Sequence, residues 1–142
     1  MRKILAIVGI LAFGLVGWQV FSSSPNQDNA PAAPAPAEIT PRTISAEDAK
    51  AIIDGDEPFV LLDVRTAEEF AEVHIQGAKL LPDYEIQTKA TAELPDKDAL
   101  ILVYCRSGAR SAKAAKTLAE LGYTNIRDMG GILDWPFETV KN

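Results

Sequence analysis

Two nearly uninterrupted apolar runs restrict the fold of this chain more than any other feature of its sequence. The runs are FVLLDV (59–64) and ALILVY (99–104), and each has the length of a buried strand. The segment SAKAAKTLAELG (111–122) instead places its apolar residues on one side of a helix and ends at a glycine. Apolar strands that alternate with helices are typical of a parallel sheet covered on both faces, so we expect an α/β fold.

The other segments continue this alternation from Thr43 onward. Ser45 and Thr66 each stand three residues before an acidic residue, which resembles the capping box that begins many helices. We therefore expect one folded domain over residues 43–142. Its further elements are predicted as helices at 45–53, 66–70 and 83–94, strands at 78–81 and 125–129, and a turn into a short helix at 130–135.

The N-terminal residues have a different character. Arg2 and Lys3 precede an apolar run of 18 uncharged residues, 4–21, which suits a short membrane anchor or a long signal peptide. The length of the run favours the anchor, and positive charges beside such a run stay in the cytoplasm. We expect residues 1–24 to be a signal-anchor or signal peptide. The rest of the chain is then periplasmic or otherwise extracytoplasmic, anchored to the inner membrane by residues 4–21.

A proline- and alanine-rich segment follows this apolar run. Five of the 17 residues from Pro25 to Pro41 are proline, and such a composition cannot build a hydrophobic core. We predict an extended, semi-stiff linker over residues 25–42.

Composition excludes several classes of function. The formal net charge is −6 and no long basic run occurs, so nucleic acid is not an expected partner. One cysteine and one histidine allow neither an internal disulfide nor a cysteine- or histidine-rich metal site, and we expect no metal and no cofactor.

The only cysteine, Cys105, follows the predicted strand 99–104 and precedes a helix. Ligands of parallel sheets bind at the carboxyl ends of strands, and Cys105 stands at such an end. Free N–H groups of a helix start and of a tight loop containing Gly108 can converge on one point and stabilise a thiolate. A small buried side chain is the plain alternative for a lone cysteine.

Charge around Cys105 also indicates a ligand. Residues 43–142 carry 11 basic and 18 acidic side chains, but residues 99–119 carry four basic side chains and no acidic one. A positive region on a negative domain favours an anionic substrate.

Several motifs occur together in a familiar order. They are LLDVRTAEEF (61–70), HIQGA (74–78), ILVYCRSGARS (101–111), LAELGYTNI (118–126) and GGILDW (130–135). This ordered set resembles the single-domain rhodaneses, and the apolar N-terminus resembles their exported, periplasmic type. The resemblance implies a rhodanese-like, five-stranded parallel sheet flanked by helices on both faces.

The resemblance also implies sulfurtransferase chemistry, in which Cys105 is the catalytic nucleophile. Its thiolate attacks the outer sulfur of an anionic donor such as thiosulfate, and cyanide or a thiol then accepts the sulfur from the Cys105 persulfide. Arg106 and Arg110 are expected to attract and orient the donor. The substrate-binding residues would be Arg106, Ser107, Gly108, Ala109 and Arg110, and the domain is expected to act as a monomer.

Residues outside this loop are expected to be structural. By the resemblance, Asp63 steadies the loop and Arg65 pairs with Glu69. His74, which could act as a general base, is usually structural in the family. Trp135 is expected to be a core or rim aromatic side chain.

Three alternatives remain open from the sequence. A cysteine phosphatase needs five residues between its cysteine and its arginine, whereas Arg110 follows Cys105 after four and position 111 is Ser111. A rhodanese-like module could instead only bind a partner or carry persulfide. An oxidant sensor is the third alternative, but the chain has no second cysteine to form an internal disulfide.

Overall fold

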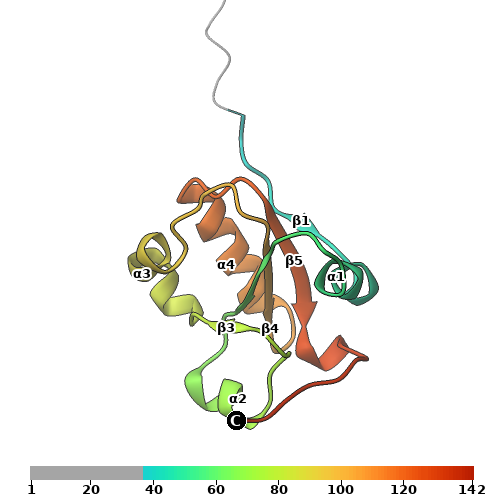
Figure 1. Cartoon of the computed structure of the whole chain (residues 1–142). Coiled ribbons are helices and arrows are strands. Elements are labelled where there is room, and N and C mark those ends of the chain that lie inside the picture. The colour runs from blue at the N-terminus through green and yellow to red at the C-terminus, as the bar shows by residue number, and fades with distance from the viewer. Residues whose placement is uncertain (1–36) are drawn as a thin grey trace, which may run out of the picture. The chain divides into compact units, whose positions relative to one another are not determined.

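A five-stranded parallel sheet with strand order β1-β5-β4-β2-β3 organises the protein (Figure 1). The computed structural model describes residues 37–142, so the predicted anchor or signal segment (1–24) and most of the predicted linker (25–42) lie outside the described residues. Within residues 37–142, no helix is long and apolar enough to span a membrane. The strands are β1 (Arg42–Thr43), β2 (Val60–Asp63), β3 (Lys79–Leu80), β4 (Ile101–Cys105) and β5 (Ile126–Gly131).

The centre of the sheet is formed by the two apolar runs of the sequence. All five residues of β4 are buried, as are three of the four residues of β2. The two strands pair with Leu62 opposite Val103. Strands buried on both faces need apolar side chains on both, which explains why these runs do not alternate with polar residues.

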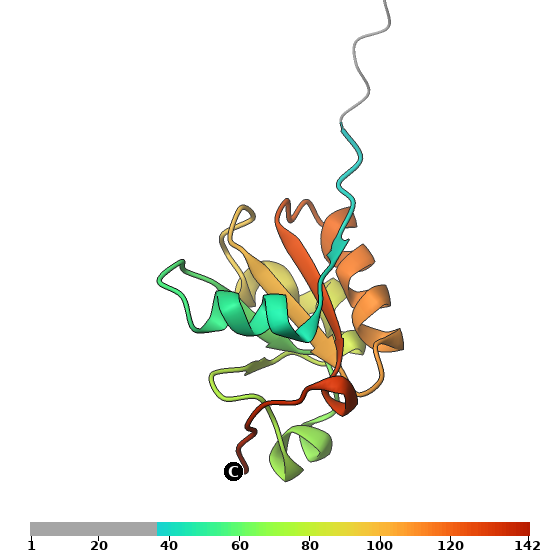
Figure 2. The same cartoon turned by 90° about the vertical axis from the view of Figure 1, so that its right-hand side faces the viewer.

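Helices cover both faces of this sheet. They are α1 (Ala46–Ile53), α2 (Ala67–Glu72), α3 (Ile86–Glu93) and α4 (Ala109–Glu120), with the 3₁₀ turns η1 (Asp83–Glu85) and η2 (Ile132–Asp134). One core includes buried side chains of α3 and α4, and the other includes those of α1 and the segment near Trp135. Figure 2 shows α1 and α4 on different sides of the strands. The predicted rhodanese-like α/β fold with a five-stranded parallel sheet is therefore confirmed.

Two helix starts follow the polar residues that predicted them. The Ser45 side chain accepts a hydrogen bond from the Asp48 N–H at 3.0 Å, which caps α1. Thr66 and Glu69 form a full capping box at α2. Such caps satisfy N–H groups that a helix start leaves free, and each contributes about 1 kcal/mol.

Most boundaries differ from the expected ones by one or two residues, and three of the differences matter here. The short strand β1 begins at Arg42, one residue before the predicted start of the folded domain. The predicted helix 83–94 begins with the 3₁₀ turn η1 because Pro82 precedes it, and only then becomes α3. Helix α4 starts at Ala109, two residues earlier than expected, and this shortens the loop after Cys105.

The carboxyl ends of the strands share one edge of the sheet with several connecting segments. Helix α2 and the C-terminus lie at this edge in both views (Figures 1 and 2). His74 pairs with Val140 through two backbone hydrogen bonds of 2.9 and 2.8 Å, which fixes the C-terminal segment beside α2. This edge is where a parallel sheet places its ligands.

Candidate active site

Cys105 is the last residue of β4 and is fully buried. Its Sγ accepts a hydrogen bond from the Gly108 N–H at 3.0 Å. The chain therefore turns around the sulfur within three residues and enters α4 directly. The sulfur therefore lies next to a helix N-terminus, which is partly positive and can bind an anion.

Gly108 makes this tight turn possible. It is the N-cap of α4 and has a φ of 103°, in the left-handed region that a side chain disfavours. A Cβ here would also touch the backbone of Gly130 at 3.6 Å. The glycine in the loop motif is thus required by the backbone shape that brings its N–H to Sγ.

The end of β5 and the turn that follows it pack against the loop after Cys105. A Cβ on Gly131 would lie 2.2 Å from the Arg106 carbonyl oxygen, so only glycine fits there. The Leu133 N–H donates to the same oxygen at 3.2 Å. A peptide C=O and its N–H point in opposite directions, so this bond turns the Ser107 N–H away from Leu133.

Hydrogen bonds of Ser111 and Asp128 stabilise the same loop. Both are buried, and the Ser111 hydroxyl donates to the Asp128 carboxylate at 2.7 Å, with the Gly108 carbonyl 3.0 Å away. Asp128 also accepts the Gly130 N–H at 3.0 Å. This pair could not be predicted from the sequence, because nothing in the sequence indicates contact between a serine of α4 and an aspartate of β5 that are 17 positions apart. The double glycine after a predicted strand was the available hint that a backbone approaches closely there.

Arg110 is bound by Glu69 of α2. Its two terminal nitrogens donate to the two carboxylate oxygens at 2.7 and 2.8 Å, in a bidentate pair. The hydrogen bonds from Arg110 lower the pKa of Glu69 from 4.5 to about 2, and those to Glu69 raise the pKa of Arg110. The expected role of Arg110 in orienting a donor stays a prediction, and its guanidinium already has this partner.

Arg106, Ser107 and Ala109 are exposed at the surface of the loop. Among the ion pairs of residues 37–142, none includes Arg106. Arg106 is therefore the arginine of this loop that is free to meet an incoming anion.

The expected pairing of Arg65 with Glu69 is wrong. Arg65 instead pairs with Asp63, with Nη2 to Oδ2 at 2.6 Å, and both side chains are almost fully buried. Its Nη2 also donates to the Val73 carbonyl at 2.7 Å. The spacing from 65 to 69 favours a pair only within a helix, but Arg65 precedes the cap of α2.

Asp63 acts on the segment after β2. Its carboxylate accepts the Arg65 backbone N–H at 2.9 Å in addition to the guanidinium. Neighbouring Tyr104 has its pKa raised by burial and by Asp63, and its hydroxyl accepts the Ile75 N–H at 3.1 Å. Asp63 thus stabilises the segment between β2 and α2. Because Glu69 belongs to α2, Asp63 also helps to position the partner of Arg110.

His74 and Trp135 are structural. The His74 ring is buried, stacks on Phe70 with centroids 3.9 Å apart, and places Nδ1 2.9 Å from the Phe70 carbonyl. Trp135 is buried, contacts Phe137 edge-on, and donates its indole N–H to the Glu138 carbonyl at 3.3 Å.

Two cavities within residues 37–142 lie away from this loop. One of about 440 Å³ lies between residues 38–43 and α4, and one of about 490 Å³ lies beside Trp135. Neither is lined by residues 105–108. Within residues 37–142, no group of three side chains could hold a metal ion.

Comparison with known proteins defines the family. Residues 45–136 match the Rhodanese-like domain family. This chain belongs to the rhodanese family. The match contains the Cys105 loop and every element that supports it.

Two named relatives and one solved structure illustrate the similarity. Thiosulfate sulfurtransferase PspE of Escherichia coli is 36% identical over 80 residues, which cover 56% of this chain and 77% of that protein. The putative sulfur carrier protein YrkF of Bacillus subtilis is 36% identical over 97 residues, or 68% of this chain and 51% of that protein. A rhodanese from E. coli, solved with anions, is 34% identical with a TM-score of 0.56 over 60% of this chain and all of that one. The protein is thus a rhodanese-like member of a sulfurtransferase family.

Proposed function

We propose that this domain is a sulfurtransferase that carries a sulfane sulfur on Cys105. The observation that supports it most is the hydrogen bond from the Gly108 N–H to Sγ at 3.0 Å, made at the N-terminus of α4. The same turn would stabilise the anion of a thiolate or of a persulfide. No cofactor is needed, because sulfur is transferred by nucleophilic displacement alone.

In the first step the Cys105 thiolate attacks the outer sulfur of thiosulfate. A new S–S bond forms to Cys105, the S–S bond within thiosulfate breaks, and its electron pair leaves with sulfite. The reactants and the products each carry three negative charges. Arg106, exposed beside the turn, attracts the anion, while the Gly108 N–H and other N–H groups of residues 106–110 would stabilise the developing persulfide.

In the second step an acceptor removes the sulfur. Cyanide or a thiolate attacks the outer sulfur of the persulfide, and the Cys105 thiolate leaves with the electron pair of the S–S bond. The products are thiocyanate or a new persulfide, and the enzyme returns to its starting state.

A persulfide carrier is the second candidate. The similarity to a protein named as a putative sulfur carrier favours it, although this chain spans only about half of that protein. A carrier would form the Cys105 persulfide in the same way but would transfer it only to a dedicated protein. Slow release to cyanide together with a stable persulfide would favour this candidate.

A cysteine phosphatase is disfavoured by the loop. Helix α4 starts at Ala109, so Arg110 lies in its first turn and is bound by Glu69. A shorter cradle around Cys105 suits one sulfur atom better than a phosphoryl group. Release of phosphate from an aryl phosphate at rates comparable to sulfur transfer would reverse this choice.

We also propose that the domain works outside the cytoplasm. The apolar run 4–21 behind Arg2 and Lys3 supports an anchor in the inner membrane, with a cleaved signal peptide as the alternative. The N-terminal sequence of the protein purified from membranes and from periplasm separates the two.

The test of the main proposal is thiocyanate formation from thiosulfate and cyanide by the full chain. We expect turnover by the wild type, a mass gain of one sulfur atom after thiosulfate treatment, and loss of both in Cys105→Ala. Thr88→Ala is a suitable control, because Thr88 is exposed on α3 and lies outside residues 105–110. Turnover that survives Cys105→Ala would exclude the mechanism.

A further inference from the structure

Glu69 links α2 to the first turn of α4 through a carboxylate that accepts three hydrogen bonds. Two N–H groups of Arg110 reach it at 2.7 and 2.8 Å, and the Thr66 backbone N–H reaches its Oε2 at 3.1 Å. Three donors therefore fix the position of one carboxylate. Arg110 lies in the first turn of α4, directly after the turn that holds the reacting sulfur, so one side chain joins this carboxylate to the site.

The pair changes the charge that a donor meets. Glu69 accepts both terminal nitrogens of Arg110 and offsets its charge, which leaves Arg106 as the exposed cation of residues 105–110. The Arg110 guanidinium is near enough to Cys105 that the thiolate, after Glu69, contributes to the raised pKa of Arg110. A sulfur donor therefore approaches Arg106, whose charge is unpaired within residues 37–142, and Arg110, whose charge is offset by Glu69.

Resting on the proposed sulfur transfer, we propose that Glu69 is a specificity-determining residue that limits the preference of this site for dianionic donors. A second negative charge on the donor gains little from a paired Arg110 and is repelled by Glu69. A monoanionic donor, such as an alkanethiosulfonate or an organic persulfide, lacks that penalty. The site is thus built to accept monoanionic sulfane donors beside thiosulfate.

The chemistry of the two donor classes is the same at the sulfur. With an alkanethiosulfonate, the Cys105 thiolate attacks the outer sulfur, the S–S bond breaks, and an alkanesulfinate leaves with the electron pair. Two negative charges enter and two leave. Only the charge of the donor differs, so the ratio of the rates with the two donors reports the electrostatics of the site.

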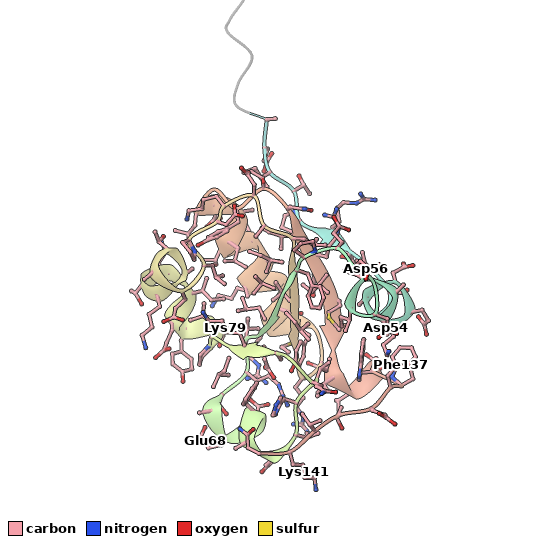
Figure 3. All side chains as sticks on the ribbon, viewed as in Figure 1. Asp54, Asp56, Glu68, Lys79, Phe137 and Lys141 are labelled. Carbon is pink, nitrogen blue, oxygen red and sulfur yellow. The ribbon has the colours of Figure 1, made fainter. Side chains whose placement is uncertain are left out.

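Glu69→Gln is a clean variant for this test. Glutamine also serves as the third residue of a capping box, so the start of α2 is retained while the charge is removed. Glu68→Gln is the matched control: it removes the same charge one position away, and Glu68 is exposed on the outer side of α2 (Figure 3). Glu69→Asp retains the charge and serves as the conservative replacement.

The experiment measures persulfide formation on Cys105 in the full chain, in single turnovers followed by intact mass, with thiosulfate and with methanethiosulfonate. We expect Glu69→Gln to raise the ratio of second-order rate constants, thiosulfate over methanethiosulfonate, on the order of three- to ten-fold, as one unit charge in a partly solvated site predicts. Glu68→Gln and Glu69→Asp should leave the ratio within about two-fold of wild type, because the first charge is exposed and screened by solvent and the second is kept.

The outcomes separate this proposal from the proposed function. If Glu69 only holds the loop in place, Glu69→Gln slows both donors equally and the ratio does not move, which overturns the inference alone. An equal change of the ratio in Glu68→Gln would also overturn it, because overall charge would then be the cause. If the wild type gains no sulfur from either donor, the proposed function itself fails.

Discussion

Two ion pairs follow neighbouring strands at the carboxyl edge of the sheet, and they differ in burial. Asp63 and Arg65 are 0% and 3% exposed, whereas the side chains of Glu69 and Arg110 are 26% and 32% exposed. The first pair closes the connection between β2 and α2. The second joins α2 to the loop of Cys105. Both are held by short hydrogen bonds, so burial is what distinguishes them.

The difference teaches what each pair can do. A buried pair has lost its water, so removing one partner leaves a charge that nothing compensates. A half-exposed pair keeps part of its water, contributes less to folding, and acts on the electrostatics of nearby ligands. We therefore expect the first pair to govern stability and the second to govern donor selection.

The largest effect is expected from Asp63→Ala. It leaves the buried guanidinium of Arg65 without its carboxylate, which should lower the free energy of unfolding by about 3–5 kcal/mol. Urea unfolding at neutral pH measures this loss, with Glu69→Gln as the comparison. A loss in Asp63→Ala no larger than that in Glu69→Gln would contradict the contrast between the pairs.

A smaller loss of stability is expected from Gly131→Ala, which disturbs the uncharged support of the same loop. Its Cβ would lie 2.2 Å from the Arg106 carbonyl oxygen, so the backbone must move, at a cost of about 1–3 kcal/mol. Because residues 105–108 move with it, sulfur transfer should fall about 100-fold. Thiocyanate formation at a temperature where the variant stays folded measures this.

Gly122→Ala provides the control for Gly131→Ala. Gly122 has a φ of 91° and no atom within 4 Å of its Cβ position, so alanine adds backbone strain without a clash. We expect a loss of about 1 kcal/mol in stability and unchanged turnover. Equal loss of turnover in both variants would mean that the end of β5 does not position the loop.

Some features of this site could be predicted from the sequence, and others depend on the fold. The position of Cys105 at a strand end and before a helix start could be predicted, because both depend on local apolar and glycine patterns. The partner of Arg110 could not, since Glu69 is 41 positions away and only the fold brings them together. The partner of Arg65 was not predicted either: the family resemblance implied Glu69, whereas the guanidinium pairs with Asp63, two positions before it.

The acid stability of the second pair gives a further test. The pKa of Glu69 is lowered to about 2 by Arg110, so its contribution is full above its ordinary value of 4.5 and is lost as the pH falls from there through about 2. We expect this loss to be roughly 1–2 kcal/mol after allowance for solvent screening. The difference in unfolding free energy between wild type and Glu69→Gln, measured from pH 6 down to the lowest pH at which the wild type folds, should shrink. A constant difference would show that the ionised pair does not contribute.

The smallest expected effect is the change with salt concentration in what each pair contributes to the free energy of unfolding. Raising the ionic strength from about 0.05 to about 0.5 M shortens the Debye length from about 14 to about 4 Å, which screens exposed charges but not buried ones. The cost of Glu69→Gln should therefore fall by about 0.3 kcal/mol, while the cost of Asp63→Ala stays the same. Urea unfolding of both variants and the wild type at the two salt concentrations measures this. If both costs fall together, the two pairs are equally open to solvent ions, and the division between a stabilising pair and a donor-selecting pair would have to be abandoned.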